Sequence, residues 1–200
     1  MTGKYEGGDR YLDPDSGILR NKLGISAQDE LERAETAYVA LAITELNFHP
    51  IEESISGPDF GYLIAIHQKL FKEVYDWAGE LRTVDISKGA TRFASFRFIE
   101  REGLRIAEKM AAENWFKNLP HEEFADQVSY YFGELNTLHP FREGNGRALR
   151  EYIRHIAVRA GHRLTWEGLD REEMIQASIS AHNENHHHLR AIILKQMSCC

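Results

Sequence analysis

The residues best suited to chemistry lie in one stretch of twelve, from His139 to Arg150, which reads His-Pro-Phe-Arg-Glu-Gly-Asn-Gly-Arg-Ala-Leu-Arg. His139 is the residue type that most often serves as a general base near neutral pH. Glu143 offers hard carboxylate oxygens, which suit a Mg²⁺ ion held by one carboxylate and substrate phosphates. Together they are typical of a site that transfers a phosphorus group from a nucleotide to a nucleophile.

A phosphate-binding turn follows directly. Residues 144–146 read Gly-Asn-Gly, and the next residues, Arg147 to Ala160, are predicted to form a helix, with Asn145 of a type suited to cap it. A glycine-lined helix N-terminus offers free N–H groups and the positive end of the helix dipole, which together suit phosphate. Arg147 and Arg150 lie three residues apart, so they share a helix face and can both reach a polyphosphate.

The stretch resembles the signature of Fic-domain proteins, H-x-F-x-[DE]-G-N-G-R-x-x-R, and matches every specified position. The resemblance implies an all-α fold, a Fic-type helical domain with a small β-hairpin flap over the active site. It also implies AMPylation, the transfer of AMP from ATP to a hydroxyl side chain of a target protein. ATP is then the substrate and Mg²⁺ the metal.

The same resemblance implies a role for each residue of the motif. His139 deprotonates the target hydroxyl, Phe141 packs into the core to fix the loop, and Glu143 holds Mg²⁺. The turn lines the α- and β-phosphates and the two arginines hold the β/γ end of ATP, so the nucleotide-binding residues are Gly144, Asn145, Gly146, Arg147 and Arg150. The alternative is a helix-capping loop with a surface histidine and solvated arginines, which leaves the coincidence of these residue types unexplained.

Length and composition set the frame around the motif. The 200 residues fit one domain, which we divide into an N-terminal arm, 1–25, and a Fic domain, 26–200, with the flap at about 83–97 and the motif at 139–150. A net charge of −7 argues against direct binding of nucleic acid. The only cysteines, Cys199 and Cys200, are adjacent, so we expect a reducing, cytoplasmic location. The sequence contains no apolar run long enough to predict a membrane span.

Apolar periodicity predicts helices on both sides of the motif. The first runs from Ser26 to about Leu46, with a capping box formed by Ser26 and Asp29. Its inward face is predicted to carry Leu31, Ala34, Tyr38 and Leu41. The others are predicted to open at Pro58 and to span 98–116, 122–137, 171–182 and 186–197. His67 lies on an apolar helix face, and we interpret it as a core histidine rather than a ligand.

Two β-rich runs predict the hairpin. Thr83–Ser87 and Thr91–Phe96 are rich in β-branched or aromatic residues and flank Lys88, Gly89 and Ala90. By the family resemblance this hairpin is the flap, on which the target protein docks by strand-like main-chain pairing. Lys88 and Gly89 would then bind near the nucleotide and the target hydroxyl. The alternative is a surface hairpin with a solvated lysine.

The helix before the motif raises a question about the base. It delivers His139 at its C-terminal end, where the helix dipole favours the protonated form of a histidine. A general base must be neutral, so His139 needs a compensating influence such as partial burial.

A second resemblance bears on regulation. Residues 19–24, Leu-Arg-Asn-Lys-Leu-Gly, are similar to the lead-in of Fic toxins that pair with a small antitoxin. Those relatives modify a tyrosine of DNA gyrase B and of topoisomerase IV, which blocks DNA replication. Fic proteins are held inactive by a helix carrying [ST]-x-x-x-E-[GN], whose glutamate pairs with the second motif arginine, here Arg150. Ser180–Asn185 matches that pattern, but C-terminal inhibitory helices follow the last core helix, so we expect an antitoxin acting in trans.

Three other interpretations stay open at this stage. The first is a Fic enzyme that uses another donor and transfers phosphate or phosphocholine, although the intact Gly-Asn-Gly-Arg run favours AMP. The chain can also be a non-catalytic binding module, against which the intact His139, Glu143 and Arg150 argue. The histidines at 182 and 186–188 are compatible with a metal site, but a polar helix start accounts for them better.

Overall fold

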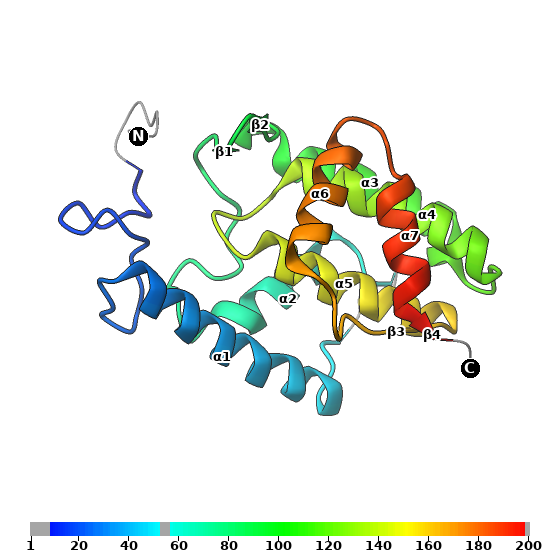
Figure 1. The fold of residues 1–200 in the computed structure, drawn as a ribbon, viewed down its shortest axis with the longest axis horizontal. Helices are drawn as coiled ribbons and strands as arrows, with labels where there is room; N and C mark the ends of the chain where they lie inside the picture. Colours follow the sequence, from blue (N-terminus) through cyan, green and yellow to red (C-terminus); the bar gives the residue numbers. More distant parts are fainter. Residues whose placement is uncertain (1–8, 53–56, 199–200) are drawn as a thin grey trace.

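The computed structural model describes residues 9–52 and 57–198 and confirms an all-α domain with a small hairpin (Figure 1). The longer elements are, in chain order, α1 (Gln28–Phe48), α2 (Phe60–Phe71), α3 (Ile99–Ala112), α4 (His121–Leu138), α5 (Asn145–Ala160), α6 (Arg171–His182) and α7 (His187–Gln196). Two short antiparallel pairs complete it, β1 (Ser87–Lys88) with β2 (Thr91–Arg92) and β3 (Arg163–Leu164) with β4 (Met197–Ser198).

Helix α5, which follows the motif turn, runs through the middle of the domain (Figure 1). It packs on α2 and α4, while α4 in turn packs on α3, α6 and α7. Buried residues occur on most of its circumference, among them Ala148, Leu149, Tyr152, Ile153 and Ile156. A helix buried on several sides belongs to the core. The motif residues at its first turn are therefore held by a helix of the core.

Helix α1 lies along one edge of the domain against α2 (Figure 1). The predicted inward face is wrong at its C-terminal end, because Leu41 is 65% exposed, whereas Leu31 is buried and Ala34 and Tyr38 are half-buried. The buried residues are Leu31, Glu35, Val39, Ala42 and Leu46. The predicted capping box is also wrong, since Ala27 occupies the N-cap and no side chain caps the helix. Because Glu35 lies on the buried face, a face predicted from apolar residues alone does not coincide with the face that is buried.

The flap hairpin is shorter than predicted. Its register pairs Ser87 with Arg92 and Lys88 with Thr91, and Gly89 at the tip has φ +58°. Beyond the paired residues, the N–H of Phe93 still donates to Ile86 O across the hairpin, and the N–H of Ala94 donates to Thr137 O at the end of α4. A two-stranded hairpin is marginal alone, so this anchoring is what supports it.

Several helix boundaries differ from the predictions. Residues 98–116 do not form one helix: α3 ends at Ala112, and a 3₁₀ turn over Asn114–Phe116 follows with positive φ at each residue. Helix α2 begins at Phe60 rather than Pro58, because the Asp59 side chain accepts from the N–H of Tyr62 and caps it. Helix α7 ends at Gln196, since β4 pairs with β3.

The described part of the N-terminal arm packs against the domain. Tyr11 is buried and lies edge-on to the ring of Trp77 at 5.4 Å. A β-bridge between Leu12 and Leu19 closes the arm into a loop. Among the helices of the described segments, none combines the length and the apolar character needed to cross a bilayer.

Candidate active site

His139 is the residue at which α4 ends. It has left-handed backbone angles, φ 48° and ψ 63°, and its N–H donates to Leu135 O. The following residue, Pro140, cannot continue a helix. The chain therefore turns sharply, and a loop of five residues, 140–144, leads to the start of α5.

The His139 ring is oriented by two contacts. Its Nδ1 lies 3.1 Å from the carbonyl oxygen of Asn136, so Nδ1 carries the proton and donates, which leaves the lone pair on Nε2. The ring of Phe93 stacks on it with centroids 3.7 Å apart. Burial lowers the pKa of His139 to about 4, the positive charges of Arg82 and Lys88 act in the same direction, and the Asn136 carbonyl and Glu143 oppose them. Burial is thus the compensating influence that keeps the base neutral.

The glycine-flanked turn is built around Phe141. Gly144, with φ +80°, is the N-cap of α5, so the predicted cap, Asn145, is instead the first helical residue. The Asn145 side chain closes the loop by accepting from the N–H of Phe141 and donating to its carbonyl oxygen, each at 2.8 Å. A Cβ at Gly144 would lie 2.4 Å from the Phe71 ring, so only glycine fits there. The first N–H groups of α5 are left without intrahelical acceptors and are available to phosphate.

His67 of α2 supports the same loop, which confirms its interpretation as a core histidine. Its ring stacks on Phe141 with centroids 3.7 Å apart. Nδ1 accepts from the N–H of Gly79, so Nε2 carries the proton and donates to Glu143 O at 3.0 Å. Burial lowers the pKa of His67 to about 3, so the ring stays neutral. His67 therefore fixes the backbone of Glu143, the predicted metal ligand, through its carbonyl oxygen.

The Glu143 side chain is 45% exposed at the mouth of the turn. Its Oε1 accepts from the N–H of Gly144 at 2.9 Å and lies 3.6 Å from the Arg147 guanidinium. No group of three or more histidine, cysteine or acidic side chains that could hold a metal ion occurs within residues 9–52 and 57–198. A Mg²⁺ ion here would take most of its oxygen ligands from the substrate phosphates, and one accessible carboxylate fits that arrangement.

The two motif arginines have different surroundings. Arg147 pairs with Glu35 of α1 at 2.5 Å, and its guanidinium lies 4.8 Å from the centroid of the Phe71 ring. Glu35 also accepts from the hydroxyl of Tyr75. Arg150 has no ion pair with any residue that the structure describes, and burial, with the nearby charge of Arg147, lowers its pKa. Sequence reasoning missed Glu35, because a single glutamate on a predicted helix carries no signal of its own.

The N-terminal arm reaches the motif through one ion pair. Arg142, in the loop, pairs with Asp9 at 2.8 Å, and both side chains are largely buried. The arm is therefore part of the site's support, a role that its sequence did not indicate.

The predicted flap residues lie on the base side of the site. Lys88 is exposed in β1, close enough for its charge to lower the pKa of His139. Gly89 lies in open space, with no atom within 4 Å of an added Cβ. The structure thus brings Lys88 near the base, and it places Gly89 at the open tip of the hairpin.

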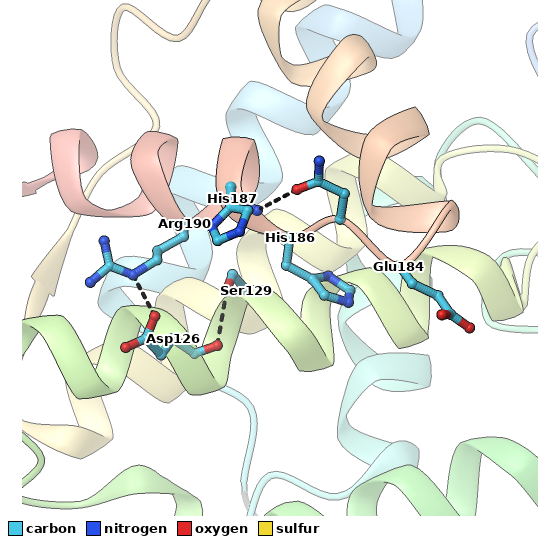
Figure 2. A pocket seen from close by; sticks show the side chains of 7 residues that line it. Asp126, Ser129, Glu184, His186, His187 and Arg190 are labelled. Carbon is cyan, nitrogen blue, oxygen red and sulfur yellow. Dashed lines mark hydrogen bonds and ion pairs between the residues drawn. The ribbon is translucent and has the colours of Figure 1, made fainter.

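A surface pocket lies elsewhere, between α4 and the turn joining α6 to α7 (Figure 2). It is lined by Asp126, Ser129, Glu184, Asn185, His186, His187 and Arg190. Figure 2 shows Arg190 paired with Asp126, so its charge is already neutralised. Glu184 is exposed, and no ion pair joins it to Arg150 in the described part of the chain. The pocket therefore contains none of the motif residues.

Comparison with known proteins gives a consistent result. A sequence model of the Fic/DOC family matches residues 58–157, from just before α2 to near the end of α5. Protein adenylyltransferase VbhT of Bartonella schoenbuchensis is 43% identical over 98% of this chain, which spans 40% of that relative's length. The probable protein adenylyltransferase Fic of Salmonella typhimurium is 37% identical over 99% of this chain and 97% of its own length.

Solved structures agree with the fold. The BepC protein of Bartonella tribocorum, with bound AMPPNP, superposes with a TM-score of 0.87 at 26% identity, covering 95% of this chain and 97% of the other. The type IV secretion system effector protein BepA gives 0.84 at 30% identity, covering 94% of this chain and 68% of the other.

Proposed function

The chain belongs to the Fic/DOC family and is a protein adenylyltransferase, and we propose that it transfers AMP from ATP to a hydroxyl side chain, a tyrosine, of a target protein. One observation carries the assignment of chemistry to this site. A neutral histidine with its lone pair on Nε2 lies one short loop away from a glycine-flanked helix N-terminus.

The reaction follows from the positions of these groups. Nε2 of His139 takes the proton of the target hydroxyl, and the hydroxyl oxygen attacks the α-phosphorus of ATP. The bond from the α-phosphorus to the bridging oxygen breaks, and pyrophosphate leaves. The N–H groups at the start of α5 bind the phosphate oxygens, and Arg150 binds the negative charge that develops on the leaving group.

Nucleotide and metal binding are part of the proposal. ATP is the substrate, supported by the similar BepC structure with bound AMPPNP. Mg²⁺, when bound, neutralises charge on the phosphates, and Glu143 would hold it. The accessible carboxylate of Glu143, fixed through its backbone by His67, supports that assignment.

The biological role proposed is that of a toxin. By the similarity of residues 19–24 to the lead-in of antitoxin-paired Fic toxins, the target is a tyrosine of DNA gyrase B or of topoisomerase IV, and its modification blocks DNA replication. We place this activity in the cytoplasm, where those targets occur and where adjacent cysteines stay reduced. The target docks on the flap over 83–97, where Lys88 lies near the base.

The test is peptide mass spectrometry after incubation with Mg-ATP and a bacterial lysate, comparing wild type with His139→Ala. We expect a gain of one AMP on a lysate protein with the wild type and none with the variant. The position of the adduct names the target and its residue. Adducts that persist with His139→Ala exclude this histidine as the base, and transfer of a group other than AMP supports another donor.

Inhibition in trans by a small antitoxin completes the proposal. Arg150 lacks an ion pair among the described residues, which suits a carboxylate supplied by a partner. We expect the purified chain alone to transfer AMP, and Glu184→Gly to leave its rate unchanged. An inactive chain that Glu184→Gly activates would show internal inhibition instead.

A further inference from the structure

Arg82 occupies an unusual position for a cation. It lies between the end of α2 and the flap, and its side chain is fully buried, with 0% exposure. A buried guanidinium needs partners for its charge and for its five N–H donors. The nearest carboxylate among the described residues, that of Asp85, is 3.9 Å away and 42% exposed. The charge of Arg82 is therefore not neutralised by a close ion pair.

Backbone carbonyls take that place. Nε donates to His139 O at 2.8 Å, and one terminal nitrogen donates to Leu138 O at 3.2 Å. These two carbonyls belong to the last turn of α4, which has no intrahelical donors for them and carries the negative end of the helix dipole. The N–H of Arg82 itself donates to Pro140 O at 2.9 Å. Arg82 thus caps α4 and holds three consecutive residues around the catalytic base.

The same guanidinium also holds both ends of the flap. It donates to Val84 O at 2.7 Å, ahead of β1, and to Ala94 O at 2.5 Å, after β2. One rigid, planar group therefore joins the two sides of the hairpin base to the turn at His139. A lysine has the charge but not the fork that reaches carbonyls in several directions.

His139 needs such support, because its left-handed backbone is strained for a residue with a side chain. Its ring is also covered by Phe93, which lies on the flap side of the same contacts. The relative position of base and flap is thus set where Arg82 bonds both. The phosphate-binding turn is held separately, by Asn145, His67 and the Asp9–Arg142 pair.

We propose that Arg82 is a positioning residue that fixes the target-binding flap relative to His139, and that it acts on the transfer step without contributing to nucleotide binding. The proposal rests on the adenylyltransferase function proposed above. A displacement of about 1 Å between reacting groups lowers a rate on the order of 100-fold.

The first experiment compares wild type, Arg82→Lys and the control Arg105→Lys, which alters an exposed arginine of α3. Initial rates of AMP transfer from α-³²P-labelled ATP to proteins of a clarified bacterial lysate are measured at saturating Mg-ATP. Affinity for AMPPNP with Mg²⁺ is measured by titration calorimetry. We expect Arg82→Lys to transfer on the order of 100-fold more slowly while its AMPPNP affinity stays within about threefold of wild type. A parallel loss of rate and affinity, or an unchanged rate, overturns the proposal.

A second measurement does not depend on the variant folding. Hydrogen exchange of the wild type compares the amides of Ala94 and Arg82, which bond to the end of α4 and its turn, with that of His139. We expect the three to exchange as one unit. Rapid exchange at Ala94 with slow exchange at His139 shows that the flap opens independently and rejects the proposal. If the wild type transfers no AMP, the proposed function fails, and this measurement still decides whether the flap and His139 are held as one unit.

Discussion

The charged side chains in two regions of the active site differ in whether they have partners within the protein. In the first, which we term the paired region, Arg147 is bound to Glu35 and Arg82 to backbone carbonyls, and His139 lies under Phe93. In the second, the unpaired region, Arg150 and Lys88 have no ion pair with the residues that the structure describes. Both regions include an arginine of the motif, so the difference comes from the neighbours of each residue.

Among the cations of the site, the difference separates those that hold the structure from those that are available to a ligand. A buried charge with a partner is expensive to strip of that partner, so changes in the paired region should lower stability. An unpaired cation at a site for an anionic substrate is available to bind, so changes in the unpaired region should lower activity alone. The resemblance assigns both Arg147 and Arg150 to the β/γ end of ATP, whereas their contacts indicate that Arg150 is the more available of the two.

The largest expected effect is on folding, in Glu35→Ala. The substitution leaves Arg147, which is 24% exposed, with only the more distant carboxylate of Glu143 at 3.6 Å, and it removes the acceptor of the Tyr75 hydroxyl. We expect the free energy of unfolding to fall by about 3–5 kcal/mol, measured by urea denaturation followed by circular dichroism. Glu35→Gln, which retains an acceptor, should lose less.

The control for this prediction lies on the same helix. Glu32 is exposed, so Glu32→Ala removes a carboxylate from α1 without exposing a buried cation. We expect its effect to stay within about 0.5 kcal/mol. Equal losses in both variants would show that the Glu35–Arg147 pair contributes no more than a surface charge, and the two regions would not differ.

The next effect is on activity, in Arg150→Ala. Removing this guanidinium takes away a cation at the phosphate end of the site, and we expect AMP transfer to fall on the order of 100-fold. Unfolding by urea should change by less than about 1 kcal/mol, because no ion pair is broken. The comparison becomes sharper with Arg147→Ala, which should lose stability as well. A large loss of stability in Arg150→Ala would place this residue in the paired region.

Most residues of the candidate site could be predicted from the sequence, because they lie in one contiguous run. His139, Glu143 and the arginines are neighbours along the chain, and the helices on either side follow from apolar periodicity. Because only a short loop joins α4 to α5, the end of the first helix must lie close to the start of the second. This proximity can be predicted without knowledge of any distant contact. The prediction of an all-α domain with a flap was confirmed for the same reason.

The support of the site could not be predicted, because it comes from contacts between distant residues. Glu35 pairs with a residue 112 positions away, and Arg82 bonds a carbonyl 57 positions away. Neither residue type is expected in a core, so each weakened the local pattern that reveals a buried face. Phe93 has no motif to mark it, and its position over His139 depends on the bonds that anchor the flap.

A smaller effect is expected in the unpaired region, from Lys88→Met. Lys88 is exposed and has no ion pair with the described residues, so its replacement leaves no buried charge without a partner. The free energy of unfolding should therefore not change. A surface charge contributes up to about 1 kcal/mol, and we expect transfer to lysate proteins to fall about fivefold with unchanged AMPPNP affinity. Initial transfer rates and titration calorimetry measure the two quantities. A loss of AMPPNP affinity would instead assign Lys88 to the nucleotide, and no change in either would leave it a solvated surface charge.

The smallest effect is expected from pH and concerns the paired region. Burial lowers the pKa of His139 to about 4, so the ring is neutral above that value and gains a proton only as the pH falls through it. An unperturbed histidine, with a pKa of about 6.5, would lose more than half of its neutral form between about pH 8 and about pH 6. We therefore expect transfer rates at saturating Mg-ATP to change by less than about twofold over this range. A fall of threefold or more that follows one ionisation near about pH 6.5 would show that His139 is solvated in the working enzyme and that Phe93 does not cover it. The pH dependence of the transfer rate of Phe93→Ala tests whether the ring of Phe93 causes the low pKa. Removing this ring should raise the pKa of His139 toward the value of an unperturbed histidine, so the rate of the variant should fall between about pH 8 and about pH 6.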